Sequence, residues 1–240
     1  MTREEFLSKK LIFKYMPLEH ALSTLRYQYL WFANPTTWND PFEKRFITTN
    51  YSDGKPFSWK ERIFCCCFTE CAACEAHWNI YSNDEVGIEC KFVRTELLNL
   101  LEQSKLQIYI GKVEYMKTSD IKKRISKIPF NPSITFNMRN NEHKVRLLML
   151  KRKAFDYEKE IRIVIVKNKK QKSLGIQFPF QLQSNIPYQV NNLIDTITIS
   201  PKVGIETTDF FKQQFNQNFP NLRVEKSHLY DEYEPSMIRL

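Results

Sequence analysis

The segment around 158–166 limits most strongly how this chain can fold. Residues 163–166, Ile-Val-Ile-Val, are β-branched and favour a buried strand. Glu158, Glu160 and Arg162 lead into this run at alternate positions, so in a strand they would share one face. Burying three charges is costly unless they are paired or used. This face therefore predicts either a structural ion-pair cluster or a functional site.

The whole chain is expected to form a single α+β domain over residues 1–240, with its core within 11–230. Strands and helices do not alternate strictly, which favours a mixed, mainly antiparallel sheet flanked by helices. Strand patterns occur at 11–15, 29–33, 62–68, 87–93, 109–115, 160–166, 194–199 and 222–226. Helix patterns begin near 18, 94 and 207, and the basic segment 118–154 is expected to be helical, with an interruption around Pro129 and Pro132.

Several common site types are excluded by composition. The chain has 5 glycines and neither a G-x-G-x-x-G nor a G-x-x-x-x-G-K-[ST] motif, so side chains rather than a glycine-rich loop would have to hold any nucleotide. No apolar run is long enough to cross a bilayer, and no signal-peptide core follows the charged first residues. We expect a cytoplasmic protein with no membrane partner.

Positive charge is concentrated in one block of the sequence. Residues 112–172 hold 18 Lys and Arg against 6 Asp and Glu, a balance of +12, within a chain of net charge +9. Such a block indicates an anionic partner, RNA or DNA, or else a solvated basic surface. Its candidate nucleic-acid contacts are Arg146, Lys151, Arg152 and Lys153.

The cysteines allow a metal alternative. Cys71 and Cys74 have a spacing that suits zinc, and Cys67 and His77 could complete four ligands. Against this, Cys65-Cys66-Cys67 lies in an apparently buried strand, where thiols pack as small apolar groups, and there is no second C-x-x-C. We therefore expect thiols without a metal.

Two polar motifs lie close to the early strands. Asn39, Asp40 and Glu43 form the densest one, which can orient a ribose or a nucleophile, or simply build a turn. Lys14 and Tyr15 lie near the end of the first strand, where a lysine can reach a phosphate or pair with Glu160. We expect Lys14, Asp40, Glu43, Glu158, Glu160 and Arg162 to gather around one cleft.

Taken together, several motifs resemble the bacterial family called domain of unknown function 2971. They are Lys14-Tyr15, Trp31-Phe32-Ala33-Asn34-Pro35, Asn39-Asp40-Pro41-Phe42-Glu43, Cys67-Phe68-Thr69, Trp78 with Tyr81, and Phe155-x-x-Glu158-x-Glu160-x-Arg162. The resemblance extends from about Leu11 to the carboxyl terminus. This chain departs from the family at Phe155, where the family usually has tryptophan, and in its extra cysteines.

The order of elements also looks like that of ADP-ribosyltransferase-like domains, in which a late strand opens with E-x-E. That resemblance implies that NAD is the substrate, that Glu160 steadies an oxocarbenium-like transition state, and that Lys14 or Tyr15 holds a ribose. It also implies that Tyr81 or Trp78 stacks on the nicotinamide. The modified target would be nucleic acid or protein, in a toxin or phage-defence setting. The alternatives are a non-enzymatic nucleic-acid or nucleotide-binding module, and an interaction or sensor subunit.

Overall fold

The computed structural model describes residues 1–48, 58–81, 86–126, 142–181 and 190–231. The helices are α1 (Arg3–Leu7), α2 (Leu18–Tyr27), α3 (Pro41–Thr48), α4 (Glu75–Tyr81), α5 (Arg94–Gln103), α6 (Thr118–Ser126), α8 (Glu142–Leu147), α9 (Val190–Leu193) and α10 (Ile205–Asn218), with short 3-10 helices at Pro35–Thr37, Ser58–Glu61 and Lys153–Glu158. The strands are β1 (Leu11–Pro17), β2 (Tyr29–Ala33), β3 (Ile63–Thr69), β4 (Gly87–Val93), β5 (Gln107–Lys112), β6 (Glu114–Met116), β7 (Leu150–Arg152), β8 (Glu160–Val166), β9 (Gly175–Pro179), β10 (Ile194–Ile199) and β11 (Arg223–Lys226).

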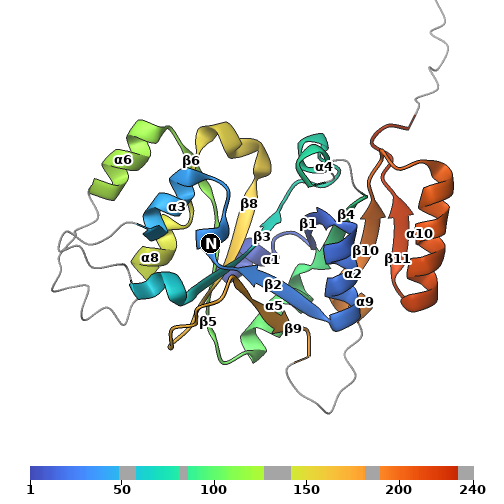
Figure 1. Ribbon diagram of the computed structural model, residues 1–240, viewed down its shortest axis with the longest axis horizontal. Coiled ribbons are helices and arrows are strands. Elements are labelled where there is room, and N and C mark those ends of the chain that lie inside the picture. The colour runs from blue at the N-terminus through green and yellow to red at the C-terminus, as the bar shows by residue number, and fades with distance from the viewer. Residues whose placement is uncertain (49–57, 82–85, 127–141, 182–189, 232–240) are drawn as a thin grey trace, which may run out of the picture.

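Within the described residues, one nine-stranded sheet organises the molecule (Figure 1). Its main path is β11-β10-β4-β1-β3-β2-β9, and β8 and β5 continue from the other edge of β3. Among the described strands of this sheet only β10 and β11 pair in parallel, while β6 and β7 form a separate parallel pair. The expected α+β class with a mixed, mainly antiparallel sheet is confirmed.

The strand β3 is the branch point of the sheet. All seven of its residues pair with β8, from Ile63↔Val166 to Thr69↔Glu160. On its other edge β3 meets β2 only at Ala33↔Cys65 and β1 only at Phe13↔Thr69. The sheet therefore opens between β1 and β2 along the middle of β3.

Both faces of β8 are buried, as its apolar sequence predicts. Ile161, Ile163 and Ile165 belong to the larger core cluster, which also contains Phe68 and Phe92. The opposite face carries Val164 and Val166, which pack with α8 and with β3 residues in a second, smaller cluster. Glu160 and Arg162 lie on this second face by strand alternation, so their charges enter the protein interior.

Helices cover the sheet from several directions. In Figure 1, α10 lies beyond β10 and β11 at one end of the molecule, while α3, α6 and α8 lie at the other. The expected helix near residue 18 is α2, whose Ala21 and Leu25 are buried and which ends at Gln28 in the left-handed conformation. Among the described helices, none is both long and apolar enough to cross a membrane.

One expectation was wrong in part, and one strand was missed. The basic segment is not helical throughout, because Leu150–Arg152 forms β7 beside β6 and Lys153–Glu158 is a 3-10 helix. The expected interruption near Pro129 and Pro132 lies outside the described residues. The strand β9 was not predicted, and it pairs with the whole of β2.

Candidate functional site

A small polar cavity lies where β1 and β3 separate. The two strands pair only at Phe13↔Thr69, so the backbone groups of β3 just before Thr69 have no strand partner in β1. The ammonium group of Lys14 takes the place of a missing strand partner, because its Nζ donates to the carbonyl oxygen of Cys67 at 2.9 Å. A buried carbonyl needs such a partner, and Lys14 is therefore fixed at the fork of the sheet.

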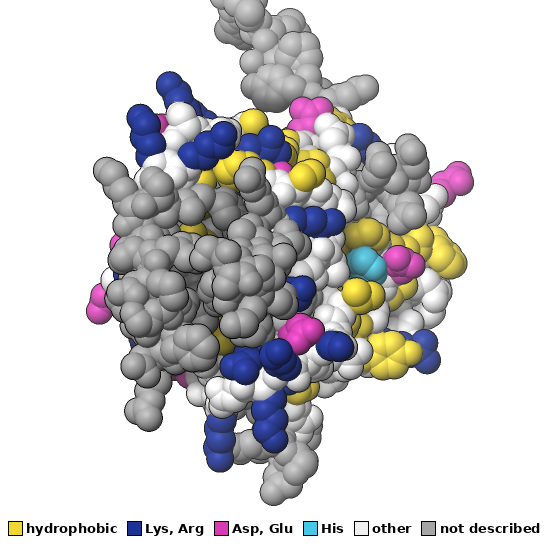
Figure 2. Space-filling view, turned by 60° about the vertical axis from the view of Figure 1, so that its left-hand side comes forward, with side chains coloured by type: hydrophobic (Ala, Val, Ile, Leu, Met, Phe, Trp, Pro, Cys, Tyr) yellow, Lys and Arg dark blue, Asp and Glu magenta, His cyan; other side chains and the backbone are white. Residues whose placement is uncertain are grey.

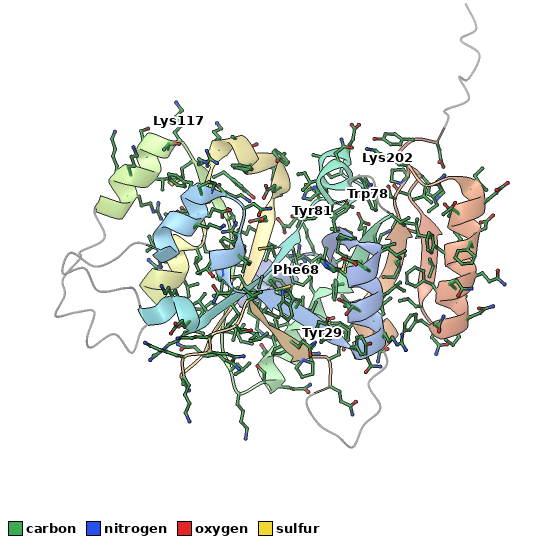
Figure 3. All side chains as sticks on the ribbon, viewed as in Figure 1. Tyr29, Phe68, Trp78, Tyr81, Lys117 and Lys202 are labelled. Atoms are coloured by element: carbon green, nitrogen blue, oxygen red, sulfur yellow. The ribbon has the colours of Figure 1, made fainter. Side chains whose placement is uncertain are left out.

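The cavity at this fork has a volume of about 60 Å³. Its walls come from β1, β3, α4, the end of the 3-10 helix Lys153–Glu158 and the start of β8, and consist of Phe13, Lys14, Tyr15, Cys67, Phe68, Thr69, His77, Tyr81, Glu158 and Glu160. Residues near the beginning of the chain, around 67–81 and around 158–160 thus bring a lysine, two carboxyl groups and several rings together. Figure 3 places Tyr81, Trp78 and Phe68 in the central part of the molecule.

Glu160 is held from one side by Arg162, whose side chain is 1% exposed. The Arg162 Nε donates to Glu160 Oε2 at 2.7 Å, and its other nitrogens donate to Glu43 and to the carbonyl oxygen of Leu148. The guanidinium also lies over the ring of Trp38, 4.4 Å from its centroid. Each polar edge of this buried cation is occupied, as a desolvated charge requires.

Glu158 and Glu160 meet at the ammonium group of Lys151. Lys151 donates to Glu158 and, at 3.4 Å, to Glu160 Oε1, and lies 3.6 Å from Glu43 Oε2. Burial would raise the pKa of Glu160, but Arg162 and Lys151 outweigh it and hold that pKa below its ordinary value. Burial and the charge of Glu160 instead raise the pKa of Glu158 to about 7. Glu160 is thus the more acidic carboxyl group of the pair and Glu158 the more basic one.

The segment 38–43 belongs to the far side of this cluster rather than to the cavity wall. Glu43 binds Arg162, and Asp40 accepts from Arg152 at 2.9 Å. Asp40 also caps α3 by accepting from the backbone N–H of Phe42 at 2.8 Å. Asn39 is exposed. The observed contacts of Asp40 and Glu43 are structural, because they connect α3 to β7 and β8.

Of the six residues expected around one cleft, Lys14, Glu158 and Glu160 line the cavity, whereas Asp40, Glu43 and Arg162 do not and lie in ion pairs behind it. Glu43, Arg162, Glu160, Lys151 and Glu158 form one ion-pair network. Glu158 and Glu160 also face the cavity that Lys14 lines, whereas Asp40 joins through its pair with Arg152, the neighbour of Lys151.

A row of stacked rings forms another wall of the cavity. The ring of His77 lies 4.9 Å from that of Tyr15 at an interplanar angle of 24° and 6.3 Å from that of Tyr81 at 15°, measured between centroids. Tyr81 is the outermost ring and is 37% exposed. Trp78 is 0% exposed and packs edge-on against Tyr15, so Tyr81, and not Trp78, is the aromatic residue that can meet a ligand.

The hydroxyl of Tyr15 is engaged within the protein. It bonds to the Glu89 carboxylate, and it accepts from the backbone N–H of Cys74 at 3.2 Å. Glu89 also accepts from the N–H of Ala73, at 3.1 Å, where the backbone has a φ of 47°. Tyr15 and Glu89 are opposite each other in β1 and β4, and together they hold the 71–74 turn beside the cavity. Sequence reasoning missed Glu89, although its place opposite Tyr15 follows once these strands are paired.

The cysteines are distributed over the fork. Cys65 and Cys66 are buried in β3, and burial raises the pKa of both thiols. Cys67 lines the cavity, and burial raises its pKa to about 12. Throughout the described ranges, no group of three or more His, Cys, Asp and Glu side chains is arranged to hold a metal ion.

The four residues predicted to bind nucleic acid lie in different environments. Lys151 is buried in the ion-pair network, so its assignment to a nucleic-acid surface needs correction: β7 turns its side chain inward, toward three carboxylates. Arg152 is partly exposed and lies over the rings of Phe42 and Phe155. Arg146 and Lys153 are exposed.

Comparison with known proteins gives a match to one family model over part of the chain, and no reaction. The family model described as "Protein of unknown function (DUF2971)" matches residues 77–163. That span begins at His77 and includes Trp78, Tyr81, Glu158, Glu160 and Arg162, which confirms the family resemblance drawn from the motifs. The motifs of β1 and of segment 38–43 lie outside the matched residues. No curated protein and no solved structure matches the chain.

Proposed function

We propose that this member of the DUF2971 family is an ADP-ribosyltransferase-like enzyme that uses NAD as its substrate. The observation that carries the proposal is the convergence of Lys14, Tyr81 and Glu160 on one cavity at the fork of the sheet. Three segments thus bring together the ammonium group of Lys14, the partly exposed ring of Tyr81 and the carboxylate of Glu160. An NAD-cleaving site needs groups of these kinds around the nicotinamide ribose.

Glu160 would act on the charge that develops during cleavage. When the bond between ribose C1′ and the nicotinamide nitrogen breaks, its electron pair neutralises the leaving pyridinium ring, and positive charge builds on the ribose. A fixed carboxylate stabilises that charge best where water is excluded. Arg162 and Lys151 keep Glu160 ionised and oriented, because each of them binds a different oxygen of its carboxylate.

The second substrate would complete the reaction by giving an electron pair to C1′ and losing a proton. Glu158 lines the same cavity, and with a pKa of about 7 it can accept that proton near neutral pH. The cavity of about 60 Å³ is far smaller than pockets that enclose whole ligands, which measure roughly 300–1,000 Å³. It would therefore contact only part of the nicotinamide end of NAD, with the rest of the molecule over the surface.

The basic block supports nucleic acid as the modified target. Exposed cations on α6, including Lys122, Lys123 and Arg124, and the exposed Lys153 and Lys169 belong to it. Figure 2 shows Lys and Arg side chains at several places on one face of the molecule. Phosphate contacts release counterions, so affinity for labelled RNA or DNA should fall steeply as salt rises. Folded protein that binds neither at low salt removes nucleic acid as a direct ligand.

The experiment that tests the enzyme follows a label from NAD to its acceptor. NAD labelled in its adenylate phosphate is incubated with the protein and, separately, with RNA, DNA or protein extract. We expect covalent transfer to one acceptor and release of one nicotinamide per transfer. If neither transfer nor nicotinamide release occurs with any acceptor, the transferase proposal fails. The protein would then be a non-enzymatic nucleic-acid or nucleotide-binding module, or an interaction or sensor subunit. The ion-pair network would in that case have a structural role.

A toxin or phage-defence setting is proposed on the same analogy. Expression of the wild-type chain in a bacterial host should then slow growth, whereas the Glu160→Gln variant should not. Equal growth of the two strains at equal protein levels would argue against that setting.

A further inference from the structure

The strands β2 and β9 carry an exposed aromatic ring that the proposed reaction does not use. Trp31 of β2 pairs with Gln177 of β9 and is 44% exposed (Figure 1). A Cβ at Gly175 would lie 2.2 Å from the Trp31 ring, so the ring fills the space that a side chain at that position would take. The glycine thus lets the indole lie against β9 while nearly half of it stays open to solvent.

A lysine-rich segment leads into β9 beside this ring. Four of the six residues from 167 to 172 are cations, namely Lys167, Lys169, Lys170 and Lys172. Lys170 lies 3.9 Å from Glu61, whereas Lys169 and Lys172 are exposed and form no salt bridge within the described part of the chain. Cations that are this dense and largely uncompensated attract an anionic partner.

Backbone hydrogen bonds hold this segment against the sheet. At its start, the N–H of Lys167 donates to the carbonyl oxygen of Arg62 at 2.8 Å. At its end, the carbonyl oxygen of Leu174 accepts from the N–H of Asn34 at 2.7 Å. Asn34 directly follows β2, the strand that carries Trp31. The lysines and the indole are therefore presented together by one fixed part of the fold.

A groove of about 450 Å³ continues along the outer edge of β9. Its walls carry the cations Lys105 and Lys167 and the amide side chains of Gln103 and Gln177. Among the described residues that line it there is no Asp or Glu. Since Gln177 is the partner of Trp31 across the two strands, the ring adjoins the groove. The volume lies within the range of ligand pockets, about 300–1,000 Å³, so the groove can take a nucleotide.

We propose that this surface binds single-stranded nucleic acid, with one base stacked on Trp31 and the phosphates bound by Lys105, Lys167 and Lys172. Each base offers a flat π face, but in a duplex these faces stack on one another, so an exposed indole selects unpaired bases. Lysines bind phosphates as point charges and add affinity without reading sequence. The inference deepens the proposed function and rests on it in one respect, that the bound strand is the acceptor of ADP-ribose.

Binding to two matched strands tests the stacked base without any need for NAD. The dissociation constants of oligothymidylate, of oligouridylate and of an abasic sugar-phosphate strand of equal length are measured by fluorescence anisotropy. We expect Trp31→Ala to weaken binding of the strands with bases about tenfold and to leave binding of the abasic strand unchanged. Trp31→Phe, which keeps a smaller ring, should recover part of the loss.

Phe210 provides the matched aromatic control, because it is 55% exposed on α10, away from β2 and β9. Phe210→Ala should bind all the strands as wild type does. Thermal unfolding checks that each variant is folded.

The salt dependence of binding tests the lysines. For single strands, each phosphate contact steepens the fall of log affinity with log salt by about 0.7. Replacing Lys105, Lys167 and Lys172 together by glutamine should therefore reduce the steepness by about 2. The matched control replaces Lys9, Lys10 and Lys202, three exposed lysines outside this surface, and should keep nearly the steepness of wild type.

Four results would overturn the inference. They are equal weakening of base-bearing and abasic strands by Trp31→Ala, equal steepness for the two triple variants, tighter binding of wild type to a duplex than to either single strand, and no binding of folded wild type to any strand at low salt. In the last case, binding to vesicles that contain phosphatidylglycerol would assign the surface to a membrane instead.

Failure of this inference can be told from failure of the proposed function. If ADP-ribose is transferred to a single strand and Trp31→Ala has the wild-type KM for that strand, the enzyme stands and the role of this surface falls. If single strands bind through Trp31 but NAD is never cleaved, the binding surface stands and the transferase falls.

Discussion

Replacing Glu158 by glutamine should stabilise the protein at alkaline pH, although it removes a buried ion pair with Lys151. Burial and Glu160 raise the pKa of Glu158 from 4.5 to about 7. A group whose pKa is raised on folding stabilises the folded state below its unfolded pKa, and this stabilisation is lost as pH rises through the folded pKa. The relevant window is therefore about pH 4.5 to 7.

The magnitude follows from the size of the shift. A change from 4.5 to about 7 corresponds to a maximum of about 3.4 kcal/mol, of which about 2.5 kcal/mol falls between pH 5 and pH 8. At pH 5 the protonated carboxyl and the glutamine amide are both neutral, so wild type and Glu158→Gln should have similar stability. At pH 8 the variant should be more stable by about 2.5 kcal/mol, since only the wild type then buries the extra charge.

Urea unfolding of both proteins at pH 5, 6, 7 and 8 measures this difference. His77 is present in both proteins, so its contribution largely cancels when the two free energies of unfolding are subtracted, and Glu160, whose pKa is held below its ordinary value, stays ionised from pH 5 to pH 8. A variant that is less stable than wild type at pH 8, by more than at pH 5, would refute the reasoning. It would mean that the ion pair with Lys151 stabilises the ionised form of Glu158 by more free energy than burial and the charge of Glu160 cost it.

The remaining predictions concern other parts of the network and fold. Glu43→Gln should lower the free energy of unfolding by about 3 kcal/mol at pH 7, because it weakens a buried pair with Arg162, and an exposed change such as Glu19→Gln should have almost no effect. A denaturation difference below about 1 kcal/mol would contradict it. Gly175→Ala should cost about 1–3 kcal/mol, because a Cβ there would lie 2.2 Å from the Trp31 ring and 2.8 Å from the carbonyl oxygen of Phe32. Trp31→Ala should relieve part of that cost in the double variant, and its failure to do so would place the strain at the backbone.

Where local pattern alone decides the structure, the sequence was a good guide. The apolar run 163–166 predicted a strand buried on both faces, and its charges were recognised as needing partners. Glu160 and Arg162 do share a face, as expected from alternation in β8. Their partners could not be predicted in the same way, since Glu43, Lys151 and Leu148 reach them through packing of distant segments.

Glu158 and Lys151 show why the rest could not be predicted. Glu158 reaches the cluster from a 3-10 helix. The turn after it places Lys159 at a φ of 43°, a left-handed conformation that usually has a glycine, so nothing in the sequence indicated this turn. In the sequence, Lys151 is one of three consecutive cations, and nothing there distinguishes it from its neighbours. Its side chain points into the protein because β7 pairs with β6. In both cases long-range contacts override the local pattern.

The most direct test of the central claim is the rate of nicotinamide release from NAD by wild type and by Glu160→Gln, with the nucleic-acid and protein acceptors present. Wild type should release nicotinamide, and Glu160→Gln, which keeps the shape but removes the fixed charge, should be slower by about 100-fold or more. Glu19→Gln, on the exposed face of α2, should match wild type. A folded Glu160→Gln variant as active as wild type, or a wild type that releases no nicotinamide, would contradict the account.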